Sequence, residues 1–487
     1  MLRLRHAPCG WLCAIALTAS LPASAPVSAA TNEYHLPTLG GVSHAASSKE
    51  ARLGRAWLRQ FRAQAPQWQD PLAHYYLDRL IARLVPHSGI SGQTPISVMV
   101  DNASLNAFAV PGGVIGINAG LFAFAPDEGA FASVLAHELG HLAQRHFARG
   151  SARAEQTQLP AMAAMLAGMV LAASGAGSAG LATAMGSQAA MLQDQLSYSR
   201  RFEQEADRVG MQTLADAGYP PDDMVRMFKA MQRMARLQGG TPPEFLLSHP
   251  VSENRLSDAQ TRAAQLSVTD THQDDTLYDM VRARALLSLH NNAPEQALIT
   301  LRQDAAESAA VTYLQALIAA DKGQTQSALG TLDRLAGQHP DLALLPASAA
   351  SIALDARLVD DAIARSQRLL RFMPGYLPAQ LTLAEAQLGR DPQAAYRLLR
   401  DVTAKHPENP LGFTLLSEAA GRSGRTGQGH LARAEYLQLT GRIDRGIRQL
   451  DIARDAAERE NNPQLEARIK SRREAFLEYR EALEEFS

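Results

Sequence analysis

The chain has 487 residues, 46% of them hydrophobic, and its 47 basic residues nearly balance 49 acidic ones, giving a formal net charge of -2. A chain of this length is longer than one that folds around a single ordinary hydrophobic core, and it is long enough for two or three domains. The sequence has neither the basic excess of a nucleic-acid-binding protein nor the polybasic run that binds anionic lipid.

Residues 1–30 have the pattern of a secretory signal peptide. Two arginines precede a short apolar run, and small residues follow, with a cleavage position before Thr31. The alternative is a membrane anchor, but the apolar run is too short to span a bilayer. Both cysteines, Cys9 and Cys13, lie in this segment. We therefore expect the exported chain to contain no disulfide and no thiol ligand for a metal.

The next segments predict helices and then a small sheet. Apolar residues three and four apart predict amphipathic helices over residues 49–66 and 71–88. The β-branched stretch at 94–102 predicts a strand, and residues 106–124 predict two extended segments joined by a turn at Pro111-Gly112-Gly113.

Asp127 is placed to cap the following helix, which we expect to continue to about Arg149. Residues 160–186 are rich in alanine, glycine and methionine and almost uncharged. They predict two packed helices with a glycine-rich break, in preference to a membrane-inserted segment, because their centre is only weakly hydrophobic.

From about residue 275 the sequence becomes periodic. Two sets of residues recur with spacings of 34 and then 33 positions: Pro340, Pro374 and Pro407, and Ala328, Ala362 and Ala395. The pattern of two helices ending in a proline resembles the tetratricopeptide repeat, and it predicts four or five units with a polar closing helix. Another kind of α-helical solenoid remains the alternative.

The stretch "SVLAHELGHLAQRH" carries the clearest chemistry. His137 and His141 are four residues apart, so on a helix both imidazoles point to one place, as the ligands of one zinc ion require. Glu138 lies beside the first histidine and could take a proton from a zinc-activated water. The HExxH motif therefore predicts a catalytic zinc site, although a chance helix can also contain it.

A catalytic zinc site needs a third protein ligand, and a metzincin-type third histidine is absent. Downstream, Glu203 and Asp207 share a helix face, so that one could bind the metal and the other orient a histidine. Glu205 should point elsewhere as a solvated charge. His146 is half a turn out of phase with the histidine pair and is expected to face away from the site.

"HELGH" and "SRRFEQEAD" together resemble the zinc peptidases related to HtpX and the CAAX prenyl protease. The resemblance implies that Glu203 is the third ligand of one Zn2+ per chain and that Asp207 orients a ligating histidine. The fold expected is α+β, mostly α, with a gluzincin-type zinc peptidase domain and a small sheet at 31–270. An α-helical tetratricopeptide-repeat solenoid is expected at 275–487.

The segment "SHPVSENR" also matches this family. In the BepA-type protease-chaperones, which the whole chain resembles, the matching histidine can occupy the fourth metal position and restrain activity. The resemblance therefore assigns a regulatory role to His249 and a catalytic one to Arg255, which would stabilise the charged intermediate. Without it, a histidine before a proline is more often an ordinary surface residue.

The resemblance further implies a periplasmic zinc endopeptidase with a chaperone-like role in assembly and quality control of outer-membrane β-barrel proteins. Its substrates would be unfolded or misassembled outer-membrane proteins. Its repeats would contact the barrel-assembly machinery, and it would act at or near the inner face of the outer membrane, with peripheral membrane contact and no nucleic acid. The rival hypothesis is a non-proteolytic repeat scaffold whose zinc site is structural.

Overall fold

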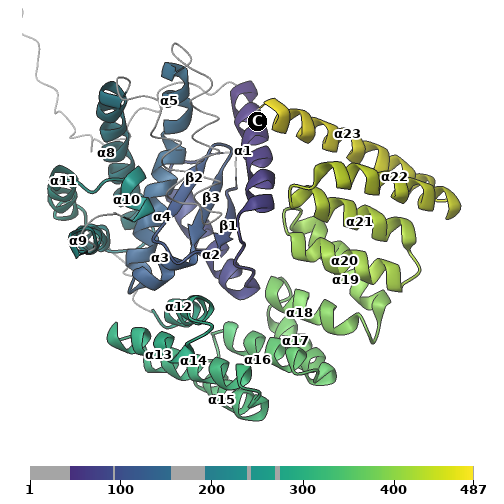
Figure 1. The fold of residues 1–487 in the computed structure, drawn as a ribbon. Coiled ribbons are helices and arrows are strands. Elements are labelled where there is room, and N and C mark those ends of the chain that lie inside the picture. The colour runs from purple at the N-terminus through teal and green to yellow at the C-terminus, as the bar shows by residue number, and fades with distance from the viewer. Residues whose placement is uncertain (1–43, 92–93, 155–191, 238–242, 269–274, 486–487) are drawn as a thin grey trace, which may run out of the picture. The chain divides into compact units, whose positions relative to one another are not determined.

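The fold is α+β and mostly helical in the part of the chain that the computed structural model describes, which is residues 44–91, 94–154, 192–237, 243–268 and 275–485 (Figure 1). These residues form one compact unit. Within these ranges, no helix combines the length and the apolar character needed to cross a membrane. The signal peptide and the helix pair expected at 160–186 lie outside the described residues.

The two amphipathic helices expected near the start are confirmed as α1 (His44–Gln64) and α2 (Pro71–Leu84), followed by a 3-10 turn, η1 (Val85–His87). Asp70 caps α2, because its carboxylate accepts hydrogen bonds from the backbone of Leu72 and Ala73 at 3.0 and 3.1 Å. The apolar face of α2 is buried in the main hydrophobic core.

The predicted strands form a three-stranded sheet in the order β1-β3-β2, from β1 (Ile96–Val100), β2 (Ala107–Val110) and β3 (Val114–Asn118). β1 runs parallel to β3, and β2 runs antiparallel to it. The predicted turn joins β2 to β3, and Gly112 and Gly113 adopt φ of 83° and 78°, which glycine tolerates best.

Among the residues that the structure describes, β2 is an edge strand that pairs with β3 alone. The bond from Asn118 N to Asn106 O continues the β2–β3 ladder. Since bonded and non-bonded pairs alternate in an antiparallel ladder, the backbone groups of Ala107 and Ala109 point away from β3. This free side of β2 lies beside the helix that carries the HExxH motif (Figure 1).

That helix is α4 (Glu128–Ala143), which follows the short α3 (Ala119–Phe124). Asp127 caps it as predicted, by accepting a hydrogen bond from Ala130 N at 2.8 Å. The prediction of one helix to Arg149 is wrong. α4 ends at Ala143, Arg145 takes a left-handed φ of 51°, and a separate helix, α5 (His146–Ala154), begins there.

α8 (Leu192–Asp216) crosses α4 at unusually close range. A Cβ atom added to Gly140 would lie 2.7 Å from Ala206 O, and one added to Gly210 would lie 2.9 Å from Ala136 O. The two glycines therefore allow the backbones to touch. The helices α9 (Asp222–Leu237), α10 (Glu244–Ser248) and α11 (Glu253–Ala263) follow α8 in the chain.

The C-terminal part is a succession of helices, each packed on the next (Figure 1). They are α12 (Thr276–Leu289), α13 (Pro294–Gln303), α14 (Ser308–Asp321), α15 (Thr325–Gln338), α16 (Leu344–Asp355), α17 (Val359–Phe372), α18 (Leu377–Gln387), α19 (Pro392–Lys405), α20 (Pro410–Arg422), α21 (Thr426–Leu439), α22 (Ile443–Arg459) and α23 (Pro463–Glu485). The periodic alanines on α15, α17 and α19 are fully buried, and each periodic proline lies two residues beyond the end of one of these helices.

Helix α1 contacts this C-terminal succession. Arg59 Nε donates a 2.6 Å hydrogen bond to Gln438, and its guanidinium lies 4.1 Å from the ring centre of Tyr479. Glu408 accepts contacts from three arginines of α1, at 2.9 Å from Arg55, 3.4 Å from Arg59 and 3.5 Å from Arg62. The first described helix is therefore joined to the C-terminal helices by charged groups, of which Arg59 and Arg62 are buried.

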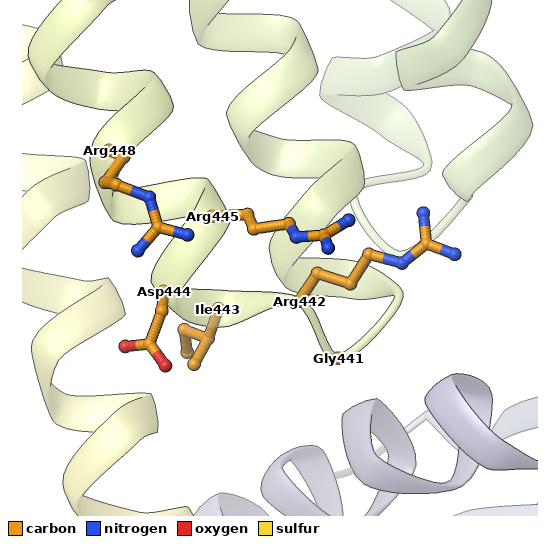
Figure 2. A pocket seen from close by; sticks show the side chains of 6 residues that line it. All are labelled: Gly441, Arg442, Ile443, Asp444, Arg445 and Arg448. Atoms are coloured by element: carbon orange, nitrogen blue, oxygen red, sulfur yellow. The ribbon is translucent and has the colours of Figure 1, made fainter.

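A cavity of about 620 Å³ opens at the start of α22. Its lining includes three exposed arginine side chains, Arg442, Arg445 and Arg448 (Figure 2). No residue expected to take part in catalysis lines it.

Candidate metal centre

Three separate elements bring four possible metal ligands together. His137 and His141 lie on α4, Glu203 lies on α8, and His249 directly follows α10. Their ligand atoms all lie within 4.8 Å of one another. The packing of α8 on α4 therefore brings the downstream carboxylate to the histidine pair.

The spacing of these atoms fits one small ion. Nε2 of His137 lies 3.1 Å from Nε2 of His141 and 3.3 Å from Nδ1 of His249. Oε1 of Glu203 lies 3.0 Å from Nδ1 of His249 and 3.4 Å from Nε2 of His141. Zinc bonds of roughly 2.0–2.1 Å in tetrahedral geometry place ligand atoms about 3.3 Å apart, which agrees with these separations.

Burial and close contacts shift the pKa values of the ionisable groups at this site in different directions. Burial lowers the pKa of His141 to about 3, so this imidazole is neutral at physiological pH. Burial also opposes protonation of His137, but hydrogen bonds to Asp207 and Glu203 outweigh it and raise its pKa to about 9. Burial disfavours the Glu203 carboxylate, yet the surrounding histidines hold its pKa well below the usual range.

Glu138 lies beside this cluster rather than in it. Its side chain is 1% exposed, and its Oε1 atom lies 3.6 Å from Nε2 of His249. Burial raises the pKa of its carboxyl group, against the effects of His249 and His137. The backbone of Ala109, on the free side of β2, opposes this rise in the pKa of Glu138. A buried carboxylate whose pKa is raised is suited to accept a proton.

Asp207 and Arg255 support the cluster from behind. Asp207 Oδ1 lies 2.9 Å from Nδ1 of His137, the nitrogen that points away from the other ligands. Arg255 binds both Asp207 oxygens at 2.7 Å and also lies 2.9 Å from Glu203 Oε2. Burial disfavours the Asp207 carboxylate, but Arg255 holds its pKa below the usual value. In this arrangement Arg255 contacts the acidic residues of the site.

Two predictions about neighbouring residues are wrong. His146 does not face away, because Nδ1 of its ring lies 3.0 Å from Nδ1 of His141. The phase argument assumed one continuous helix, whereas the break at Arg145 restarts the helix with His146 turned toward α4. Glu205 is not a solvated charge, since it lies 3.1 Å from Nε2 of His146 and accepts a 2.6 Å bond from Arg149.

Sequence reasoning also overlooked Arg149 and Phe202. Phe202 stacks on His146 with 4.2 Å between ring centres and a 16° angle between planes. A signal was available, because Arg149 lies three residues after His146 and would share its face on a helix that began at His146. Only the position of the helix break was missing.

Comparisons with known proteins agree with this geometry. The model of peptidase family M48 matches residues 71–263. A protein named beta-barrel assembly-enhancing protease, from Yersinia pestis, is 33% identical over 452 residues, which cover 90% of this chain and 92% of that protein. The chain belongs to peptidase family M48. The Escherichia coli (strain K12) protein of the same name is 33% identical over 429 residues, 86% of each chain.

A more distant relative of this M48 enzyme is the mitochondrial metalloendopeptidase OMA1 of Schizosaccharomyces pombe, 29% identical over 181 residues, which cover 37% of this chain and 50% of that protein. The M48 match includes every residue of the cluster together with Glu138, Asp207 and Arg255. The enzyme is therefore a metalloendopeptidase, and the four-residue group is its candidate metal site.

Proposed function

We propose that this M48 enzyme is a zinc endopeptidase of the bacterial periplasm that acts on outer-membrane β-barrel proteins during their assembly and quality control. The observation that carries the proposal is the four-donor cluster with the buried Glu138 carboxylate beside it. The names of the bacterial relatives, beta-barrel assembly-enhancing proteases, support the class of substrate.

His137, His141 and Glu203 would hold one zinc ion, which when bound acidifies a water molecule and polarises the scissile carbonyl group. Glu138 would accept the proton from the attacking water and pass it to the leaving amine. Asp207 would orient His137 through its far nitrogen, and Arg255 would keep Asp207 and Glu203 ionised and in place.

His249 would be a restraint on this chemistry. Its Nδ1 atom lies among the other three donors, where it would complete a closed set of four protein ligands. A catalytic zinc site needs one open position, so His249 has to leave before substrate can react. It belongs to the segment between α10 and α11, and a shift of this segment would open the site.

The C-terminal helices would be tetratricopeptide-type repeats that bind clients or the barrel-assembly machinery, with the peptidase domain at 31–270 and the repeats at 275–487. The 34- and 33-residue periods and the buried alanines at equivalent helix positions support this. The signal-peptide pattern of residues 1–30 supports export to the periplasm, and the enzyme would act near the inner face of the outer membrane.

The test combines metal analysis with a cleavage assay on a purified, unfolded outer-membrane barrel protein. Wild-type enzyme should contain one zinc per chain and cut this substrate, and a chelator should stop cleavage. Glu203→Gln and His141→Ala should contain much less zinc. Full zinc occupancy in both variants would refute the ligand assignment. If neither the zinc-loaded wild type nor the zinc-loaded His249→Ala variant cuts the substrate, a scaffold with a structural zinc site is favoured instead.

A further inference from the structure

Each histidine of the HExxH motif is connected to an arginine through a chain of close polar contacts. For His137 the chain passes through the Asp207 carboxylate to Arg255. For His141 it passes through His146 and then Glu205 to Arg149. The first chain uses the usual carboxylate partner, whereas the second inserts a neutral imidazole between ligand and carboxylate.

The second chain determines which nitrogen of each ring carries a proton. If Nε2 of His141 binds the metal, the proton of that ring is on Nδ1. It then donates across the 3.0 Å separation to Nδ1 of His146, which must be unprotonated. The remaining proton of His146 is on Nε2, where it donates to Glu205 at 3.1 Å. Every hydrogen bond in this order has one donor and one acceptor.

His146 is held rigidly enough to impose this order. Its side chain is 4% exposed, and its ring stacks on Phe202. Glu205 is fixed in turn by Arg149, whose guanidinium lies 4.8 Å from the ring centre of the same Phe202. His146 is also the first residue of α5, directly after the left-handed Arg145, so the helix break aims its ring at α4.

We propose that His146 is the positioning residue for His141: it accepts the Nδ1 proton of His141 and thereby holds Nε2 toward the metal. This inference rests on the proposed zinc site but assigns a role to a residue outside the ligand set. Losing such a partner typically weakens metal binding about 10–100-fold. A ring without nitrogen atoms could keep the stack on Phe202 while losing the hydrogen bonds, so mutation can separate packing from hydrogen bonding.

Two substitutions make this separation. His146→Phe keeps an aromatic ring against Phe202 but removes both hydrogen bonds. His146→Gln offers a carbonyl oxygen to His141 and an amide N–H to Glu205, so it can restore the chain. A matched control is His430→Phe, because His430 is partly buried and, like His146, bonds through Nδ1, in its case to Gln449 at 2.6 Å on the C-terminal helices.

The full-length protein is prepared in the Glu138→Gln background, so that self-cleavage does not alter the samples. Zinc affinity is measured by competition with a chelator, and the visible absorption of the cobalt(II)-substituted protein reports the ligand geometry. We expect His146→Phe to bind zinc about 10–100-fold more weakly and to change the cobalt spectrum. His146→Gln should recover most of both, and the His430→Phe control should match the parent protein.

Two results would overturn the inference. One is a zinc affinity of His146→Phe within twofold of the parent, even if its metal-free form melts at a lower temperature, because that describes a packing role only. The other is an equal loss in His146→Phe and His146→Gln. Neither result touches the proposed function, which fails separately if the parent protein binds no zinc.

Discussion

Glu138 is buried and lies beside the metal-ligand cluster, so its role as a proton acceptor can be tested by a substitution of equal size. Glu138→Gln preserves the size of the side chain and removes only its ability to take a proton. We expect zinc content and thermal stability to stay near wild type, while proteolysis falls roughly 10²–10⁴-fold. Metal analysis and substrate cleavage on the same preparation measure this. Wild-type cleavage by the variant would show that another group is the base.

His249 contributes the fourth donor atom of the cluster, and removing it should release the site. We expect His249→Ala to raise basal cleavage and self-cleavage, because the fourth position becomes available to substrate. Zinc content should change little, since three ligands remain. Loss of both activity and zinc would instead make His249 an essential ligand, and unchanged activity would contradict the restraint.

At the scale of elements, the free side of β2 is placed to bind an extended client as an added strand. The outward backbone groups of Ala107 and Ala109 lie next to α4, and one of them already contacts Glu138. We expect N-methylation of single backbone amides near the scissile bond of a peptide substrate to reduce cleavage at least tenfold. Alanine replacement of its side chains should have smaller effects, because strand pairing uses main-chain bonds. Cleavage controlled by one side chain would contradict this.

The packing of α12 on α14 should give stability a dependence on pH. Asp279, on α12, is 3% exposed and accepts a 2.8 Å bond from Glu307 N at the start of α14. Burial raises its pKa to about 6. As pH rises from about 4 to 6, this group ionises in the unfolded chain before it does so in the folded one, so its contribution to stability is present at low pH and lost above about pH 6.

Asp279→Asn removes this ionisation and can still accept the bond from Glu307. We therefore expect the free energy of unfolding of the variant, relative to wild type, to rise by about 2–3 kcal/mol between pH 4 and pH 7. Denaturant titrations at the two pH values measure the difference. Asp341→Asn, at an exposed position, is the control and should show no such trend. A pH-independent difference for Asp279→Asn would contradict the prediction.

The same elements show what could be predicted from sequence. The pairs His137–His141 and Glu203–Asp207 follow from helix periodicity, and the β-branched stretches and Pro-Gly-Gly turn were enough to predict the sheet. The direction of His146 could not be predicted, because α4 ends without a glycine or proline and Arg145 takes a positive φ instead.

Contacts between distant parts of the sequence could not be predicted either. The bond between Asp207 and Arg255 and that between Arg59 and Gln438 join residues that no local pattern relates. Periodicity gives the face on which a residue lies but not the element that packs against that face. Glu205 is the clearest case, since its predicted direction away from Glu203 is the direction of α5.

At the scale of the whole molecule, Glu408 is the anion that joins α1 to the C-terminal helices. Burial lowers the pKa of Arg62 to about 10, and of its charged neighbours Glu408 raises that pKa whereas Arg59 and Arg55 lower it. Glu408→Gln would leave these arginines close together with weaker compensation. We expect it to reduce the free energy of unfolding by about 2–3 kcal/mol and to speed hydrogen exchange in α1, since Glu408 is still partly exposed.

The matched control is Glu418→Gln, which breaks an exposed pair with Arg422 on α20 and should cost less than about 1 kcal/mol. Thermal unfolding of both variants gives the comparison. Equal effects would mean that Glu408 is an ordinary surface charge and that α1 is held by its apolar contacts alone.

Because the backbones of α4 and α8 touch, two glycines at the contact should be as sensitive to substitution as the metal ligands are. Gly140 and Gly210 carry no reactive group, yet any side chain at either position would force the two helices apart and separate Glu203 from His137 and His141. A saturation screen scored by proteolysis alone would rank both glycines with the ligands. Scoring the same library for folded protein and for bound zinc would distinguish spacers from chemical groups.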